Sequence, residues 1–538
     1  MAHARVRHFA TPGRIRLTGR VLALASLALG FFVAAPPGRA TPTNRPNFVI
    51  LCADDMRWDS LGVVQRERGP HARFPWFETP NLDRLATGGV RFRNAFVVHS
   101  LCSPSRAAML SGRYGHLNGI IDNSTPFPTN TVTWATLLRA AGYVNGYVGK
   151  WHMGTQLARP GFDWVATYLG QGDYETNNFI VNGVTNRIVG WVDDVNTDFA
   201  TNFITLHRSN SFALFVGYKS PHNPITPPQR FANLYSTNVS GPILNSNAVP
   251  PWDPDPSYPS PARIRNYHRC VFGVDDNVGR ILNLLDQLNL ASNTVVTFLS
   301  DNGRFLGEHG QGDKRSAYEE SLRIPFLLRY PKLVGPSNVN DHIVLNLDLA
   351  PTILDLAGLP VPAEMQGRSL KPILSGQTNG WRTAFFYEYF LEGTSIVPNL
   401  YAFRTTTNKL VMYPEHPEWA ELYAPTSDPY ETNNLITHPA WAATRALLES
   451  ELVRQMNELG LLARLIGPVR SGNTAQLLLR GGFGPGWQVQ SSPDAVTWTT
   501  FATARMTNAT GDGAEALVTD TAATTARRFY RARLIANE

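Results

Sequence analysis

Residues 47–55 read NFVILCADD, an apolar run that ends in two aspartates. A run of this kind, without alternating polar residues, is typical of a strand buried on both faces, as in a parallel sheet. Four similar runs follow along the chain, at residues 143–148, 212–218, 294–299 and 324–329. Helical patterns lie between them, the longest at residues 263–289 and another at 348–357. Strands that alternate with helices predict an α/β fold with a central, mostly parallel sheet flanked by helices.

Polar side chains stand at or just after the ends of these apolar runs. They are Asp54, Asp55, Lys219, His222, Asp301 and Asn302. Ligands of open α/β sheets bind beyond the carboxyl ends of the strands. Because these ends meet at one edge of a parallel sheet, the placement of the polar residues indicates a single site.

The composition changes twice after the predicted sheet. From about Trp381, patterns typical of antiparallel strands precede a helix at residues 440–459. We therefore expect a smaller α/β subdomain over residues 381–467, after a main domain over residues 41–380. The last part of the chain has short strand patterns separated by Gly, Pro, Asn and Asp. These patterns predict a small all-β module over residues 468–538.

The first 40 residues have the composition of a secretory signal peptide. Six arginines, without any lysine or acidic residue, surround the apolar run 21–35, and a Pro-Pro-Gly break and the small residue Ala40 follow. This order predicts a cleaved signal peptide over residues 1–40 and a secreted or periplasmic protein. The alternative is a membrane anchor, but the run of about 15 residues is shorter than the roughly 20 that a spanning helix needs. We expect no stable membrane span in the mature chain.

The formal net charge of +6 at first favours an anionic partner. The six arginines of residues 1–40 account for all of it, so the mature chain has no net charge. Without a basic field, we expect no binding to nucleic acid. The three cysteines, Cys52, Cys102 and Cys270, are an odd number for a secreted chain. We expect Cys52 and Cys270 to be buried free thiols, with a disulfide between them left open.

Residues 102–113 read CSPSRAAMLSGR. They resemble the signature of sulfatases, C-x-P-S-R followed by x-x-x-L-[ST]-G-[RK], with every diagnostic position filled. The resemblance covers most of residues 45–440. Its further motifs lie at residues 47–50, 54–55, 149–152, 220–222, 300–303, 313–325 and 422–435. The chain is similar to the formylglycine-dependent type I sulfatases of the alkaline phosphatase superfamily, and among them to the glycan-type branch such as N-acetylglucosamine-6-sulfatases.

This resemblance implies an alkaline-phosphatase-like fold and a hydrolase of sulfate esters, with a sulfated glycan as the substrate. The nucleophile would be a formylglycine, made from Cys102 by a formylglycine-generating maturation enzyme. The implied Ca²⁺ site, for which Mg²⁺ is the lesser candidate, consists of Asp54, Asp55, residue 102, Asp301 and Asn302. Arg106 would hold the formylglycine and offset charge near the metal. The implied contacts to the sulfate are Lys150, His222 and Lys314, and His152 would bond the hydrated aldehyde.

The chemistry agrees with these implied roles. A hydrated aldehyde carries two hydroxyls, of which one attacks sulfur and expels the alcohol. The other then loses its proton and ejects sulfate, an exit that a serine ester lacks. The helical pattern that starts at Ser103 places residue 102 at a helix N-terminus, where backbone N–H groups favour an anion. Carboxylate and amide oxygens are the hard ligands that suit Ca²⁺.

Two other functions stay open at this point. A phosphodiesterase or phosphonate monoester hydrolase of the same superfamily would share the fold, although the sequence shows no clear second set of metal ligands. An inactive glycan-binding protein is the other, because Trp487 and Trp498 could stack on sugars, although such residues are more typical of a small core. Arg304 stands where the resemblance implies an aromatic or small residue, which leaves the substrate open.

Overall fold

The computed structural model describes residues 45–236, 241, 245, 248–253, 258–462, 464–481, 486–505, 508–510, 513–523 and 528–534. The predicted signal peptide, residues 1–40, lies outside these ranges. Within the ranges, no helix combines the length and the apolar character needed to cross a membrane.

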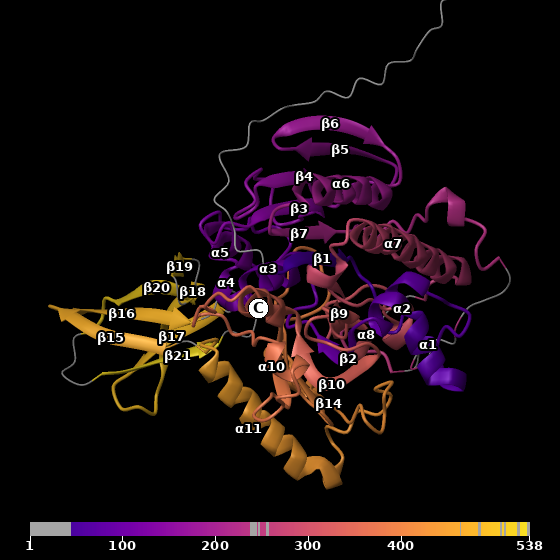
Figure 1. The fold of residues 1–538 in the computed structure, drawn as a ribbon. Coiled ribbons are helices and arrows are strands. Elements are labelled where there is room, and N and C mark those ends of the chain that lie inside the picture. The colour runs from indigo at the N-terminus through magenta and orange to yellow at the C-terminus, as the bar shows by residue number, and fades with distance from the viewer. Residues whose placement is uncertain are drawn as a thin grey trace, which may run out of the picture. The chain divides into compact units, whose positions relative to one another are not determined.

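A ten-stranded sheet forms the centre of the main domain (Figure 1). Its strands follow the order β10 (Asn338–Leu345), β2 (Val90–Phe96), β9 (Phe326–Arg329), β8 (Thr294–Ser300), β1 (Asn47–Ala53), β7 (Phe212–Gly217), β3 (Val144–Lys150), β4 (Trp164–Tyr168), β5 (Thr176–Val181) and β6 (Val184–Val189). The neighbours β8, β1, β7, β3 and β4 run parallel. Toward the edges, β9, β5 and β6 pair antiparallel. The predicted parallel sheet is therefore the central part of a larger mixed sheet.

The apolar run at residues 324–329 is a strand whose direction differs from the parallel arrangement. It forms β9, which pairs antiparallel with β8. The connection from β8 to β9 contains only a loop, a single 3-10 turn and the four-residue helix α8 (Glu319–Leu322). Without a longer crossover helix, the chain turns back beside β8 instead of returning to run parallel. Several predicted site residues lie in this connection.

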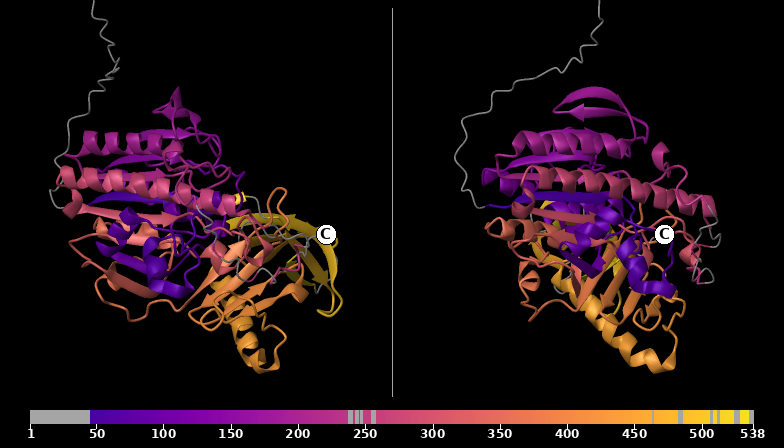
Figure 2. Two further views of the ribbon diagram at one scale, coloured as in Figure 1. Left: turned by 90° about the vertical axis from the view of Figure 1, so that its right-hand side faces the viewer. Right: turned by 45° about the vertical axis from the view of Figure 1, so that its right-hand side comes forward.

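Strand β1 is covered on both faces, as its apolar run predicts. Phe48, Ile50 and Cys52 belong to one core, and Val49 and Leu51 belong to the other. The first core includes helices α3 (Cys102–Ser111), α5 (Trp134–Ala140) and α9 (Leu349–Leu356). The second includes α1 (Gly62–Arg68), α2 (Pro80–Thr87), α6 (Val192–His207) and α7 (Pro261–Gln287). The long helices α6 and α7 lie side by side (Figure 2).

The predicted state of the cysteines is confirmed. Cys52 on β1 and Cys270 on α7 are both buried and free, as is Cys102 at the start of α3. The three thiols lie on different elements, and none of them forms a disulfide.

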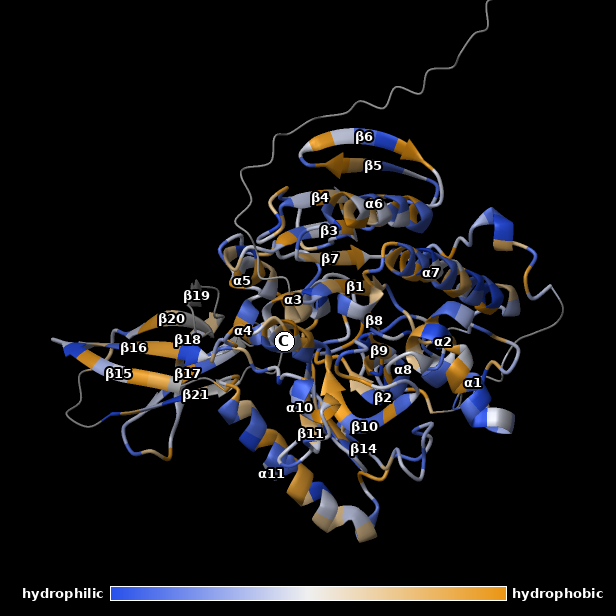
Figure 3. Cartoon of the chain, in the orientation of Figure 1, coloured by the Kyte–Doolittle hydropathy of each residue, from blue (hydrophilic) through white to orange (hydrophobic). Residues whose placement is uncertain are grey.

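A second, antiparallel sheet begins at Ala384. It consists of β11 (Ala384–Tyr389), β12 (Leu400–Thr405), β13 (Lys409–Met412) and β14 (Glu421–Tyr423), and helix α11 (Ala442–Glu458) follows. Figure 3 shows polar and apolar residues mixed along α11, of which Leu448, Leu452 and Met456, four residues apart, are buried. The ring of Phe385 stacks on that of Phe96, with 4.8 Å between centroids, and the sheet's apolar side chains join the core of α3. This sheet therefore extends the main core.

The C-terminal module contains two antiparallel sheets. One consists of β15 (Arg464–Ser471), β16 (Thr474–Gly481), β20 (Gly513–Asp520) and β19 (Asn508–Thr510), and the other of β18 (Thr499–Arg505), β17 (Gly486–Ser492) and β21 (Phe529–Leu534). Its small core is formed by Leu479, Trp487, Val489 and Val518. Trp487 is thus a core residue, whereas Trp498 is half-buried, with the guanidinium carbon of Arg531 4.2 Å from its ring centroid.

Candidate active site

Neighbouring parallel strands end at one place, and the predicted site residues stand at these ends. Asp54 follows β1, Asp301 follows β8, Lys150 is the last residue of β3, and His222 lies in the loop after β7. The backbone N–H of Asp301 donates to the carbonyl at the end of β1 at 3.1 Å. The strand order thus collects side chains that are far apart in the sequence.

Cys102 is the first residue of helix α3 and is fully buried. Leu101 before it is extended (φ −152°, ψ 140°), so the helix begins at residue 102 itself. The thiol Sγ lies 3.2 Å from Lys314 Nζ and 3.6 Å from Lys150 Nζ. It also lies 3.6 Å from Asp54 Oδ1. A helix N-terminus and two ammonium groups together make the surroundings of this residue favourable for an anion.

Each of the two ammonium groups is also paired with a carboxylate. Lys150 Nζ contacts Asp54, and Lys314 Nζ contacts Asp55. Burial by itself raises the pKa of both carboxyls, but the positive charges of the lysines hold these pKa values below their usual range. Burial raises the pKa of the Cys102 thiol to about 12, despite the two lysines. The unmodified thiol is therefore protonated at neutral pH and a poor nucleophile.

Asp301 is held by Arg106. Two guanidinium nitrogens of Arg106, Nε and Nη2, each lie 2.9 Å from Asp301 Oδ2. Asp301 Oδ1 accepts from the backbone N–H of Asp55 at 3.1 Å. Burial and the negative charge of Asp54 raise the pKa of Asp301 to about 7. Arg106 offsets charge beside the predicted metal site, and in the described part of the chain it makes no hydrogen bond to Cys102.

Asp55 is bound on both of its carboxylate oxygens. Oδ1 accepts from Asn302 Nδ2 at 2.7 Å and contacts Lys314. Oδ2 accepts from Arg304 Nη1 at 2.6 Å. Asn302 Oδ1 is buried and has no hydrogen-bond partner. Arg304, the residue that departs from the sulfatase pattern, is therefore a buried member of the site, which its sequence position alone did not indicate.

The two predicted histidines lie near the cluster but make different contacts. His222 Nε2 lies 3.9 Å from Asp55 Oδ2, and its Nδ1 lies 2.7 Å from the next residue's carbonyl oxygen. His152 Nε2 lies 3.0 Å from Gln171 Nε2. Burial lowers the pKa of His222 to about 4. Burial, together with the charge of Lys150, lowers the pKa of His152 to about 2. Both rings are neutral at neutral pH.

The residues at the strand ends fit a hard divalent cation. One atom from each of Asp54, Asp55, Cys102 and His222 lies within 4.8 Å of the others. Carboxylate oxygens are two of the four atoms, and the unpartnered Asn302 Oδ1 offers a further, neutral oxygen; these three oxygens are ligands that suit Ca²⁺. His222, expected at the sulfate, belongs to the group. Asp301, which is expected as a ligand, lies beside this group of four residues, and its carboxylate forms an ion pair with Arg106.

Other residues beside the site carried no signal in the sequence. Asn123 Oδ1 accepts from the backbone N–H of Ser103 in α3 at 3.0 Å, and the Asn123 N–H donates to Glu392 at 3.0 Å. Arg315 Nη2 lies 2.8 Å from the same Glu392 carboxylate. Asn123 and Glu392 belong to loops outside any recognised motif, and only folding brings them next to helix α3.

Carboxylates and lysines gathered at the ends of the central parallel strands form a site of the kind that binds an anionic ester beside a cation. Residues 46–359 match the sulfatase family model, and residues 307–458 match the C-terminal region of N-sulphoglucosamine sulphohydrolase. The chain belongs to the sulfatase family, and it is a hydrolase of sulfate esters.

Several of its relatives act on sulfated sugars. N-acetylglucosamine-6-O-sulfatase of Bacteroides thetaiotaomicron is 30% identical over 519 residues, which cover 81% of this chain and 90% of that protein. N-acetylgalactosamine-6-sulfatase of Mus musculus is 31% identical over 416 residues, which cover 68% and 72%. A solved structure in complex with its substrate D-glucosamine-2-N,6-O-disulfate has a TM-score of 0.70 and 29% identity, and covers 77% of this chain and 98% of that one.

Proposed function

We propose that this protein removes sulfate from a sulfated carbohydrate, with a formylglycine made from Cys102 and a bound Ca²⁺. The observation that carries the proposal is the position of residue 102. It lies buried at the start of α3, with the ammonium nitrogens of Lys314 and Lys150 at 3.2 and 3.6 Å. A sulfate ester held by these two lysines would have its sulfur next to the side chain of residue 102.

The chain's own residues would divide the remaining roles as follows. Lys150 and Lys314 bind sulfate oxygens and stabilise the negative charge that develops on them. Arg106 keeps Asp301 in place at the metal site. The neutral ring of His152 accepts a proton from a hydroxyl of residue 102. When bound, Ca²⁺ supplies further positive charge for the sulfate oxygens, and formylglycine supplies a nucleophile that can release sulfate again.

The leaving alcohol needs a proton, and the site offers more than one donor. Lys150 contacts Asp54, Lys314 contacts Asp55, and His222 lies next to Asp55. We assign this role to the lysine and histidine set as a whole, since their geometry toward a leaving oxygen depends on the substrate.

Glucosamine 6-sulfate is the first substrate to test. Two observations support it: the relatives that act on 6-sulfated hexosamines, and the similar structure that holds a disulfated glucosamine. These relatives are 29–31% identical to this chain.

Maturation and export would precede folding. Cys102 is fully buried in the folded chain, so a formylglycine-generating enzyme would reach it only while residues 102–113 are unfolded. This order is compatible with the predicted signal peptide over residues 1–40, which would mark the chain for export. We therefore propose a secreted or periplasmic enzyme.

The matured full-length chain should release sulfate from glucosamine 6-sulfate faster than from an N-sulfated or a galactose-based analogue. The chain would be expressed together with a formylglycine-generating enzyme and recovered from the periplasm or medium. Its intact mass would report both the new N-terminal residue and the state of residue 102. Sulfate release would be measured on each defined monosaccharide, with an aryl phosphonate and a phosphodiester alongside.

Two outcomes would change the assignment. Faster cleavage of the phosphonate or phosphodiester than of any sulfate would favour the phosphohydrolase alternative. A chain with complete formylglycine that binds sulfated glycans and turns none of them over would favour the inactive glycan-binding protein.

A chain that ends at Leu462, just before β15, should stay folded and keep its rate on a small soluble sulfate ester within about twofold. Every predicted site residue precedes Arg315, and the module has a core of its own. Thermal unfolding and kcat/KM on the small ester would be compared with those of the full chain. A large loss on this ester would show that the module supports the catalytic domain, and the proposed domain division would be wrong.

The same truncation distinguishes a glycan-binding module from a spacer. If Trp498 contacts sugar, the shortened chain should lose rate only on polymeric substrate, because the gain from a second binding surface disappears on monomers. Trp498→Ala in the full chain is the matched control, since it removes the half-exposed ring and keeps the module. Equal rates for all three chains on the polymer would rule out stacking by Trp498.

A further inference from the structure

His152 is held by a residue that lies outside the sulfatase motifs. Gln171 stands between two glycines with left-handed backbone, Gly170 (φ 61°) and Gly172 (φ 65°). A Cβ atom at Gly172 would lie 2.4 Å from the ring of Tyr168, so no larger residue fits there without displacement. The chain turns sharply at this point, and the side-chain nitrogen of Gln171 reaches His152 Nε2 at 3.0 Å.

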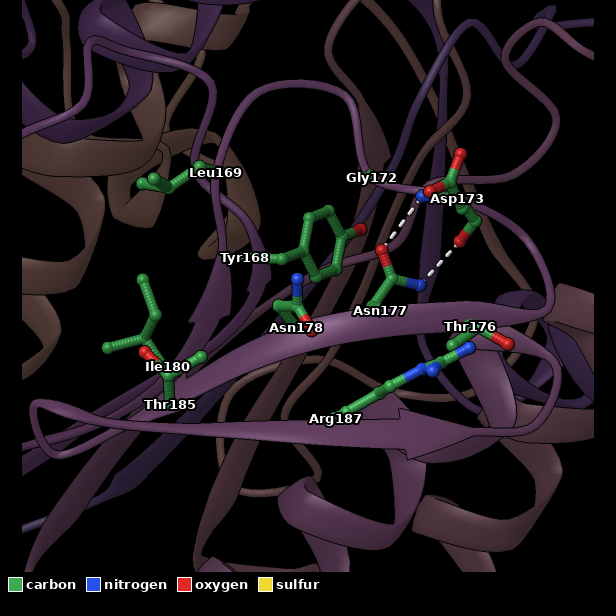
Figure 4. A pocket seen from close by; sticks show the side chains of 10 residues that line it. All are labelled: Tyr168, Leu169, Gly172, Asp173, Thr176, Asn177, Asn178, Ile180, Thr185 and Arg187. Atoms are coloured by element: carbon green, nitrogen blue, oxygen red, sulfur yellow. Dashed lines mark hydrogen bonds between the residues drawn. The ribbon is translucent and has the colours of Figure 1, made fainter.

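The loop that contains Gln171 spans residues 169–175, between β4 and β5, and is anchored near its β5 end. The backbone N–H of Asp173 donates to Asn177 Oδ1 at 2.7 Å, and Asn177 Nδ2 donates back to the Asp173 carbonyl at 2.5 Å (Figure 4). Gly172 and Asp173 line a polar cleft of about 790 Å³, but Gln171 is not among its lining residues. Gln171 contacts His152 instead, so one part of this loop borders the cleft and another part contacts the predicted site.

Lys219 connects the Gln171 loop to the loop that contains His222. Its Nζ donates to the carbonyl oxygens of Gln171 at 3.0 Å and of Asn223 at 3.3 Å. The ammonium also lies 5.0 Å from the ring centroid of Tyr174, whose hydroxyl donates to the carbonyl of His222 at 2.7 Å. In the described ranges, Lys219 forms no ion pair with a carboxylate. The buried ammonium group of Lys219 therefore holds the Gln171 loop and the His222 loop together through uncharged carbonyl groups.

Gln171 is chemically suited to hold a ring that changes protonation. His152 Nδ1 and Gln171 Oε1 are both buried and without a hydrogen-bond partner. A primary amide can present either its NH₂ group or its oxygen, so it can bond Nε2 whether that nitrogen accepts or donates. The ring is thereby held through Nε2, and Nδ1 is left for a reacting hydroxyl.

We propose that Gln171 is a positioning residue that orients His152 and, as a neutral amide, lets the ring take up and release a proton during turnover. This inference rests on the proposed role of His152 in sulfate ester hydrolysis. Loss of a side chain that orients a functional histidine typically costs about 10- to 100-fold in activity. The sulfate contacts through Lys150 and Lys314 are separate, so substrate binding should change little.

Two substitutions separate orientation from charge. Gln171→Leu keeps the size of the side chain and removes the hydrogen bond, so kcat on an aryl sulfate should fall about 10- to 100-fold with KM nearly unchanged. Gln171→Glu keeps an acceptor for Nε2–H and should recover much of this rate. Its carboxylate favours the protonated ring, so the acidic limb of the pH–rate profile should move up by about one unit. A role in packing alone would survive Gln171→Leu, which keeps the size of the side chain, so the rate would then not fall.

The controls use the same loop and the same preparation. Asp173→Asn changes an exposed side chain two residues away and should alter neither the rate nor the pH profile. Rates would be normalised to the formylglycine content and to the folded fraction from thermal unfolding. An active wild type whose rate survives Gln171→Leu, or whose pH profile is unchanged in Gln171→Glu, would overturn this inference. A fully matured wild type without sulfatase activity would instead contradict the proposed function.

Discussion

Replacing Cys102 by alanine should abolish turnover, with kcat/KM on an aryl sulfate reduced by roughly 10⁴-fold or more. The loss is expected because the side chain that would form the covalent bond to sulfur is removed, while the lysines that bind the sulfate remain. Sulfate should therefore still bind. Inorganic sulfate would be titrated into the variant while its fluorescence or thermal stability is measured. This measurement separates binding from catalysis.

The chemical state of residue 102 is part of the same prediction. In active wild-type protein, the peptide that contains this residue should have lost the thiol sulfur and gained an aldehyde oxygen, as read from its mass. An active preparation in which Cys102 is entirely a thiol would contradict the proposal. Cys270→Ala is the matched control, because Cys270 is also a buried free thiol. It should cost about 1 kcal/mol of stability and leave the rate intact.

Replacing Asp301 by asparagine should lower kcat/KM by about 100-fold and weaken Ca²⁺ binding by a similar factor. Asp301 contacts the backbone of Asp55 and the guanidinium of Arg106, so the change removes a negative charge beside the metal group and frees Arg106. Calcium would be measured per folded chain by elemental analysis and by titration. Retention of stoichiometric Ca²⁺ and a full rate would contradict the assignment, and a tightly bound pair of zinc ions would favour the phosphohydrolase alternative.

The same substitution should also destabilise the fold. Breaking a buried pair leaves Arg106 without its carboxylate, which costs about 3 to 5 kcal/mol of unfolding free energy. Asp348→Asn is the matched control, because Asp348 and Arg382 form another buried pair, at 2.8 Å, that contains no predicted site residue. This control should lower thermal stability comparably, yet leave the calcium content and the rate per folded chain unchanged.

The central strands could be predicted because their apolar runs reflect burial on both faces. In β1, alternate side chains belong to the two cores above and below the sheet, so no polar position interrupts the run. The direction of β9 could not be predicted in this way. An apolar run has the same appearance in a parallel and an antiparallel strand, and the direction follows from the short connection that contains α8.

The sequence by itself indicated the family, the proposed nucleophile at residue 102 and the gathering of acids at the strand ends. These features are local: the signature occupies residues 102–113, and Asp54 and Asp301 each directly follow an apolar run. Only the tertiary structure showed that Arg106 binds Asp301, that Arg304 binds Asp55, and that His222 lies within the metal group. Side-chain direction at the end of a strand depends on neighbouring loops, which leave no periodic pattern in the sequence.

Gln171 and Lys219 show this division most clearly. Gln171 is a neutral amide in a loop and would ordinarily be taken for a solvated side chain. Lys219 is predicted at the site because it follows an apolar run, but the sequence does not show which groups it contacts. The contact of Gln171 with His152 exists because β4 and β3 are neighbours in the sheet, and that of Lys219 with Gln171 because β7 lies on the other side of β3. Motifs record the groups that perform chemistry, whereas packing between distant loops decides which groups hold them in place.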